Sequence, residues 1–341
     1  MAPSFKELWD EALAQGEGRH EAGVSIGGME LVFRSEDEEP VARLKEFLSR
    51  HLTTTHSPGV REHHILIAHG HFPDEPQVAD NGSVWSGRMQ DGTPVRLVRT
   101  GEGVSELRFG RSVSLLTDVE ACRTLCLMKG SNGSGGEGRS RTRPDYLIPF
   151  LHFLFSVHNV YIIHAAGICC DDRSYLLLGP SGVGKTTASV NLACAGMAFM
   201  GDDLIAVEER EGALIAHALL FKAKVEMDTG TGKKGLDVGA LSDIRLRYEA
   251  PLGGIVFLQR SPDAAYRFEP VARTQTLKWL LDQANDIRFM WRPREWFRTA
   301  SAIADRIPGG LWSMGRPEDG VGHFVECITR IGNDPADSGG E

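Results

Sequence analysis

The sequence lacks several features that mark whole classes of protein. Its six cysteines include no Cys-x-x-Cys pair and no Cys/His set with zinc-finger spacing, which excludes the common structural zinc sites. The net charge is −9, and an acidic chain lacks the broad basic face that general nucleic-acid binding needs. No basic segment followed by an apolar run opens the chain, so we expect no signal peptide.

An uninterrupted apolar run of membrane length is also missing. The most apolar stretch, residues 147–163, is broken by Pro149, His152 and His158, whereas a bilayer span needs about 20 mainly apolar residues. This stretch predicts a buried helix that leads into a buried strand. The cysteine pattern is typical of free thiols in a reduced compartment. We therefore expect a cytoplasmic protein with neither a membrane nor a nucleic acid as partner.

Length and composition predict a globular chain with more than one domain. With 341 residues, 41% of them hydrophobic, the chain is too long for one ordinary core. The segment 129–145 is rich in glycine, serine and arginine, which is typical of a linker. We predict a small α+β domain of unknown role at 1–128, this linker, an α/β domain at 146–332, and a disordered tail at 333–341.

The N-terminal segment carries local signals for a mixed domain but no catalytic constellation. A helix is expected at 4–15, where Ser4 and Glu7 have the spacing of a capping box. The segment 24–34 is strand-like and broken by two glycines, which predicts a hairpin. Apolar spacing at 118–128 indicates a further helix.

A glycine-rich phosphate loop dominates the second half of the sequence. Residues 179–186 spell GPSGVGKT and match GxxxxGK[ST] in full; the glycines let backbone N–H groups turn inward around phosphate oxygens. Strands expected at 160–169 and 174–178 precede the loop, and a helix at 187–195 follows it with its N-terminal dipole toward the same anion. The residues expected to bind the nucleotide are Gly179, Pro180, Ser181, Gly182, Val183, Gly184, Lys185, Thr186 and Thr187.

Side chains within and after the loop suit phosphoryl transfer. Lys185 supplies a positive charge for the β- and γ-phosphates, and the Thr186 hydroxyl suits Mg²⁺. Asp202 and Asp203 follow a short strand at 198–200, where adjacent residues point to opposite faces. One carboxylate is thus expected to face the metal and the other the acceptor hydroxyl. His164, in the strand before the loop, is either a functional residue or a satisfied core residue.

The order His164-Ala165-Ala166-Gly167, then the phosphate loop, then Asp202-Asp203 resembles the C-terminal domain of the HPr kinase/phosphorylase family. The nucleotide-binding part of that fold is similar to that of phosphoenolpyruvate carboxykinase. The resemblance implies an α/β P-loop domain that uses ATP and Mg²⁺, with His164, Lys185 and Asp203 in catalytic roles. Asp203 would accept the proton of the substrate hydroxyl, and Asp202 would assist at the metal or hold that base.

Two departures from the family pattern concern its later motifs. The Glu-x-Arg-Gly signature is absent, and in its place Glu226 or Asp228 could complete a metal site with Thr186 and Asp202. The later catalytic arginine has no clear counterpart; the candidates are Arg260, Arg267 and Arg273.

Together these features predict an ATP- and Mg²⁺-dependent kinase that transfers the γ-phosphoryl group to a hydroxyl. The acceptor is a serine of a peptide or protein, or alternatively a small molecule of a biosynthetic pathway. A third hypothesis is a catalytically inactive, nucleotide-binding regulatory protein. Since the resembled family forms oligomers, a homo-oligomer is also an expectation.

Overall fold

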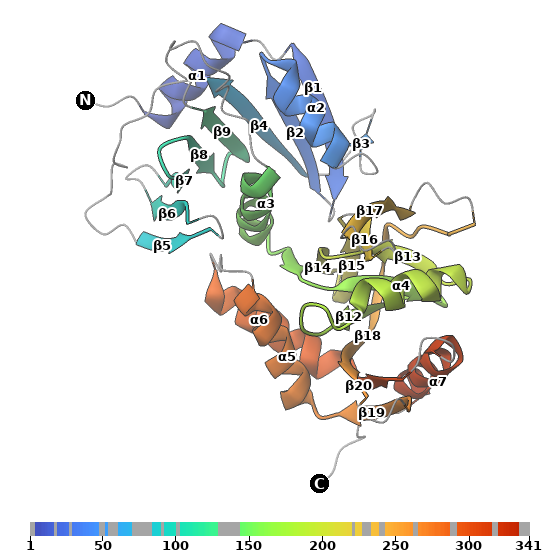
Figure 1. Ribbon diagram of the computed structural model, residues 1–341. Helices are drawn as coiled ribbons and strands as arrows, with labels where there is room; N and C mark the ends of the chain where they lie inside the picture. Colours follow the sequence, from blue (N-terminus) through green and yellow to red (C-terminus); the bar gives the residue numbers. More distant parts are fainter. Residues whose placement is uncertain are drawn as a thin grey trace. The chain divides into compact units, whose positions relative to one another are not determined.

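The chain folds into two compact units, Met1–Val157 and His158–Glu341, both of mixed α/β composition (Figure 1). In the part of the chain that is described, no helix is long and apolar enough to cross a membrane. The structure, a computed structural model, describes residues 4–16, 19–26, 29–47, 52–53, 61–69, 84–89, 92–99, 103–128, 144–219, 222–226, 233–238, 243–261, 265–286, 292–315 and 320–333.

The N-terminal unit is built on one nine-stranded sheet with the strand order β3-β1-β2-β4-β9-β8-β7-β6-β5. Strand β4 runs parallel to β2 and to β9, and the remaining neighbours are antiparallel. The elements of this unit are α1 (Phe5–Gly16), β1 (His20–Ile26), β2 (Met29–Ser35), α2 (Glu38–Phe47), β3 (Leu52–Thr53), β4 (Arg61–His69), β5 (Val84–Arg88), β6 (Pro94–Arg99), β7 (Ser105–Phe109), β8 (Val113–Asp118), β9 (Arg123–Met128) and α3 (Pro144–Val157).

Local signals at the start of the chain are confirmed. The Glu7 N–H donates to Ser4 Oγ over 3.2 Å, and the Ser4 N–H donates to Glu7 Oε2 over 2.7 Å, which is a reciprocal capping box. The helix then buries Trp9 in a cluster with Leu66 and Leu125 of the sheet. Strands β1 and β2 form the expected antiparallel hairpin.

The helix predicted at 118–128 is wrong, because the segment is a turn followed by strand β9. The Asp118 carboxylate accepts a hydrogen bond from the Ala121 N–H over 2.9 Å, and Cys122 adopts a left-handed φ of 52°. This turn sends the chain back antiparallel to β8 and parallel to β4. Pairing on both sides outweighs the weak helical spacing of the apolar residues. Residues 129–143 of the predicted linker lie outside the described residues.

The C-terminal unit is built on a second sheet with the order β10-β14-β15-β18-β12-β11-β13, to which β20 and β19 are added beside β18. The elements of this unit are β10 (Tyr161–Ile163), β11 (Ala166–Cys170), β12 (Arg173–Leu178), α4 (Lys185–Cys194), β13 (Ala198–Gly201), β14 (Ile205–Arg210), β15 (Ala213–Ala218), β16 (Lys222–Glu226), β17 (Lys233–Asp237), β18 (Glu249–Arg260), β19 (Arg267–Val271), α5 (Arg273–Asp286), α6 (Pro293–Arg306), β20 (Gly309–Met314) and α7 (Gly320–Asn333).

Alternating side chains of this sheet enter two cores. Leu176 and Leu178 of β12 share one core with Trp279 of α5 and Trp296 of α6. Leu177, between them, faces a second core that includes residues of α4 and α7. Strand β18 runs parallel to both β12 and β20. The carboxyl ends of these three strands therefore meet at one edge, where ligands of α/β sheets bind.

The strand expected at 160–169 is divided in two. Strand β10 pairs with β14, whereas β11 pairs with β12 and β13, and His164 lies in the bend between β10 and β11. The strand change places His164 outside regular pairing, which the apolar run did not indicate. Residues 334–341 of the predicted tail lie outside the described residues.

Candidate nucleotide site

The glycines of the phosphate loop are required by its backbone. Strand β12 ends at Leu178, and α4 begins at Lys185 with Gly184 as its N-cap. Gly179, Gly182 and Gly184 have φ values of 144°, 79° and 114°, a region that residues with a Cβ rarely adopt. A Cβ at Gly179 would also lie 2.9 Å from the Leu258 carbonyl oxygen. The loop thus combines left-handed turns with close contact to β18.

Lys185 is buried within this loop. The residue is only 6% exposed. Its Nζ atom donates to the carbonyl oxygen of Gly179 over 2.8 Å and to that of Pro180 over 3.4 Å. The first turn of α4 carries this lysine, so its charge adds to the positive end of the helix dipole. Both fields favour a bound anion at the loop.

Asp202 meets the loop from strand β13. Gly201 ends this strand with a φ of 133°, and the Thr186 hydroxyl donates to Asp202 Oδ2 over 2.7 Å. Asp202 is only 1% exposed. A hydroxyl and a carboxylate held together are hard oxygen donors of the type that Mg²⁺ prefers. Thr186 and Asp202 therefore fit the metal role predicted for them.

Asp203 lies in a different environment from its neighbour. Its φ of 67° is left-handed, and its side chain is 45% exposed. The Oδ1 atom lies 3.7 Å from Nε2 of His164, whose side chain is 25% exposed. Two adjacent carboxylates are thus separated, one buried against the loop and one open to solvent beside a histidine.

An arginine from β18 also contacts the loop. Arg260, the last residue of that strand, donates from Nη2 to the Gly182 carbonyl oxygen over 3.1 Å. The other two arginine candidates lie elsewhere, Arg267 at the start of β19 and Arg273 at the start of α5. Of the three, Arg260 is the one that the structure brings to the phosphate loop.

The structure thus assembles most of the predicted site residues, while their roles stay predictions. Ser181 within the loop and Thr187 directly after it are exposed. Glu226 is the last residue of β16, but its side chain lies outside the described residues, and so does Asp228. The metal-binding role of Glu226 or Asp228 therefore stays a prediction.

Sequence reasoning missed a pocket beside the loop. It has a volume of about 430 Å³ and lies between α4, the ends of β18 and β20, and α7. Tyr266, Trp312 and Met314 line it, together with Thr187 and Asn191 of α4. These residues are far apart in the chain, and no local pattern joins them. The aromatic residues near the end of the chain were the available signal.

Comparison with known proteins adds little to this geometry. No protein-family model matches the chain, and no curated protein matches it significantly. Among solved structures, the chain is similar to the Hpr(Ser) kinase/phosphatase from Coxiella burnetii, with 17% sequence identity and a TM-score of 0.32. That likeness covers 50% of this chain and 88% of the other.

Proposed function

We propose that the C-terminal unit is an ATP- and Mg²⁺-dependent kinase that transfers the γ-phosphoryl group to a hydroxyl. The observation that supports this most strongly is the difference in environment between Asp202 and Asp203. Asp202 accepts the Thr186 hydroxyl at 2.7 Å, while Asp203 lies solvent-exposed beside His164. Nucleotide binding alone requires no second carboxylate beside a histidine, whereas transfer to a hydroxyl uses a proton acceptor.

Each residue has a distinct task in this proposal. The loop amides and Lys185 hold the β- and γ-phosphates, and Arg260 adds positive charge at Gly182. Thr186 and Asp202 would hold Mg²⁺, which neutralises phosphate charge when it is bound. Asp203 accepts the proton as the acceptor oxygen bonds to the γ-phosphorus and the bond to the bridging oxygen breaks, releasing ADP. His164 orients the Asp203 carboxylate.

The acceptor is a serine hydroxyl of a peptide or protein in our preferred version, with a small-molecule alcohol as the alternative. The departures from the family pattern after Lys222 favour an acceptor other than HPr. The exposed carboxylate of Asp203 is compatible with a large acceptor, since a side chain that is 45% exposed is reachable from solvent.

An Asp203→Asn variant tests the proposed base. Asparagine keeps the size of the side chain and tolerates the left-handed backbone, but it does not accept a proton. We expect ATP to bind as tightly as to the parent, while transfer falls by about 10²- to 10⁴-fold. Calorimetry would measure binding, and mass spectrometry of serine peptides and alcohols incubated with ATP would measure transfer.

A matched control is Asp171→Asn, in the β11–β12 turn. Asp171 is exposed and has a φ of 49°, so the substitution makes the same change on a similar backbone. It should leave binding and transfer unchanged. Equal turnover by the Asp203→Asn variant and the parent would show that Asp203 is not the base. A parent chain that binds ATP but transfers nothing would favour the regulatory hypothesis.

A further inference from the structure

The pocket beside the phosphate loop has a defined orientation relative to the proposed transfer site. Its lining includes Gly184 and Thr187 at the start of α4. Thr186 lies between these two residues in sequence, but it turns its hydroxyl to Asp202 instead. Neighbouring residues of a helix point about 100° apart. The pocket and the Asp202–Asp203 side therefore lie on different sides of the first helical turn.

This arrangement dictates which end of a nucleotide meets the pocket. The proposed function, on which this step rests, places the γ-phosphate toward Asp203 and the β-phosphate at the loop amides and Lys185. The α-phosphate then follows on the other side of the loop, toward Thr187. The nucleoside attached to it enters the space along α4, where Asn191 lies one turn after Thr187 on the same helical face and also lines the pocket.

The pocket walls suit a flat heteroaromatic ring. In the pocket lining, Tyr266 stacks on His323 of α7 with ring centroids 5.3 Å apart and an interplanar angle of 16°. The ring of Tyr266 also lies 5.9 Å from that of Trp312, and Met314 lines the same wall. On the α4 side, Thr187 and Asn191 are exposed and offer hydrogen-bonding groups. The volume of about 430 Å³ falls within the range of small-molecule sites, about 300 to 1,000 Å³.

We propose that this pocket is the nucleoside subsite of the phosphate donor. A purine base packs against the wall of Tyr266, Trp312 and Met314, and the ribose lies beside Thr187. Asn191 hydrogen-bonds the base and selects among nucleotides. Arg260, at the pocket rim, contacts the loop at Gly182 and marks the junction between the base and the phosphates.

Two bulky substitutions on α4 separate this subsite from the phosphate loop. Asn191→Trp fills the pocket from its exposed edge, whereas Cys194→Trp adds the same bulk at an exposed position that does not line the pocket. The ligands are ATP and inorganic tripolyphosphate, which has the phosphates but no nucleoside. We expect Asn191→Trp to weaken ATP binding by about 10-fold or more and to leave tripolyphosphate binding within about twofold. Cys194→Trp should affect neither ligand.

The outcomes distinguish this inference from the proposed function. Unchanged ATP binding by Asn191→Trp, or an equal loss for both ligands, would overturn the nucleoside subsite. A parent chain that binds neither ligand would overturn the nucleotide site itself, and the subsite with it. Photolabelling of the parent with 8-azido-ATP gives a second readout. The labelled peptides should contain Tyr266 or residues 312–315, and labelling elsewhere would contradict the assignment.

Discussion

Both units bury charged and polar side chains in a sheet, but they use them differently. In the N-terminal unit, Glu106 and Arg108 are each 4% exposed and Ser114 is fully buried. The Glu106 Oε1 atom accepts from Arg108 Nε over 2.9 Å and from Ser114 Oγ over 2.6 Å. All three residues lie within strands β7 and β8. The hydrogen bonds of these three residues thus link one another within paired strands.

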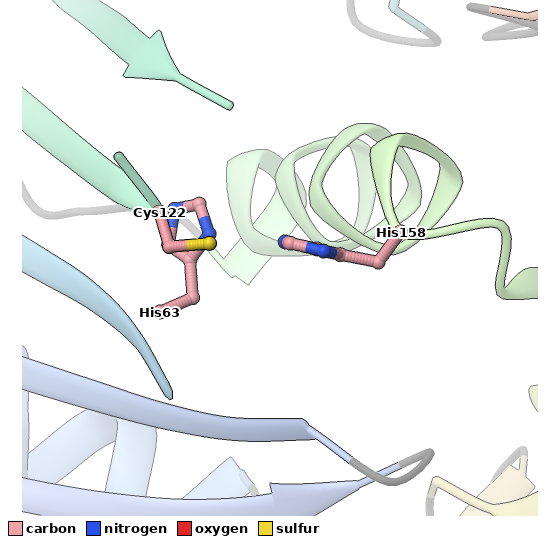
Figure 2. Close-up of side chains that lie close together, drawn as sticks. All are labelled: His63, Cys122 and His158. Carbon is pink, nitrogen blue, oxygen red and sulfur yellow. The ribbon is translucent and has the colours of Figure 1, made fainter. Parts of the chain in front are cut away.

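A second buried group in the N-terminal unit follows the same pattern. The His63 ring hydrogen-bonds Thr124 Oγ1 over 2.8 Å, and that oxygen lies 2.9 Å from Thr117 Oγ1. Figure 2 shows His63 on β4 beside Cys122; His158, also drawn there, belongs to the other unit. Nε2 of His63 is thus paired with a hydroxyl of the neighbouring strand β9, again within regular structure.

The C-terminal unit also pairs a buried histidine within its sheet, His217 of β15 with Glu208 of β14, but its buried Lys185 and Asp202 lie beyond the ends of strands. Lys185 follows β12 through a glycine loop, and Asp202 follows β13 through Gly201. Lys185 binds backbone carbonyls, which a phosphate is able to replace as its partner. Under the proposed function, burial of charge stabilises the sheet where strands pair, and binds the nucleotide where left-handed loops follow the strands. The predictions below test that distinction.

The largest effect is expected at Lys185. Replacement by methionine keeps most of the apolar length but removes the charge that the proposed function assigns to the phosphates. An arginine that stabilises the transferred phosphoryl group in other enzymes contributes about 10³- to 10⁵-fold to turnover, and we expect a loss of similar size here while the fold persists. Lys278→Met, an exposed change on α5, is the control. Full turnover by the Lys185→Met variant would show that the buried lysine of the phosphate loop has no role in transfer.

The matching change in the N-terminal unit is Glu106→Ala. It removes the carboxylate that Arg108 and Ser114 bind, and breaking a buried pair costs about 3–5 kcal/mol. Urea denaturation should show this loss, whereas ATP binding below the transition should be retained. Glu120→Gln, an exposed change in the β8–β9 turn, should alter neither. A stable Glu106→Ala variant with impaired nucleotide binding would reverse the roles assigned to the two units.

Buried His152 of α3 predicts a pH dependence of stability. Burial lowers the pKa of His152 to about 3 from an ordinary value of 6.5. Below pH 6.5 the unfolded chain binds a proton that the folded chain does not, so stability falls as the pH falls toward 3. Between pH 7 and pH 5 the loss is roughly 2 kcal/mol. Denaturation curves of His152→Leu should show a correspondingly flatter pH dependence, and an unchanged slope would contradict this cause.

The smallest effect is expected at the capping box of α1. Ser4→Ala removes the side-chain acceptor of the Glu7 N–H and should cost about 1 kcal/mol, measured as a lower thermal midpoint. Ser25→Ala, an exposed change on β1, gives the baseline for losing a serine hydroxyl. Equal midpoints for the two variants would mean that the cap adds nothing to the N-terminal unit.

What the sequence predicted correctly was local. The capping box at Ser4 and the antiparallel pairing of β1 with β2 depend on residues near one another in the chain, so pattern and structure agree. The glycine spacing of the phosphate loop also predicts its backbone conformation, because the positive φ values fall at glycines such as Gly179 and Gly184.

What the sequence did not show depends on contacts between distant segments. The segment 118–128 is a turn and a strand because β4 and β8 pair with it. His164 lies outside a strand because β10 and β11 have different neighbours. The pocket is lined by Asn191 and Tyr266, which the parallel pairing of β12, β18 and β20 brings into the same region. Such features follow from topology, which a single sequence does not encode in any one motif.

The left-handed backbone at Asp203 limits what a mutational scan at this position would mean. Glycine, asparagine and aspartate adopt a φ near 67° at lower cost than most other residues. Alanine, or glutamate with its retained carboxylate, would add a backbone cost at this position. A saturation library would therefore report strain and lost chemistry together at nearly every substitution. Asparagine keeps the size and the backbone preference of aspartate, so the phenotype of that variant reports the loss of the carboxylate rather than backbone strain.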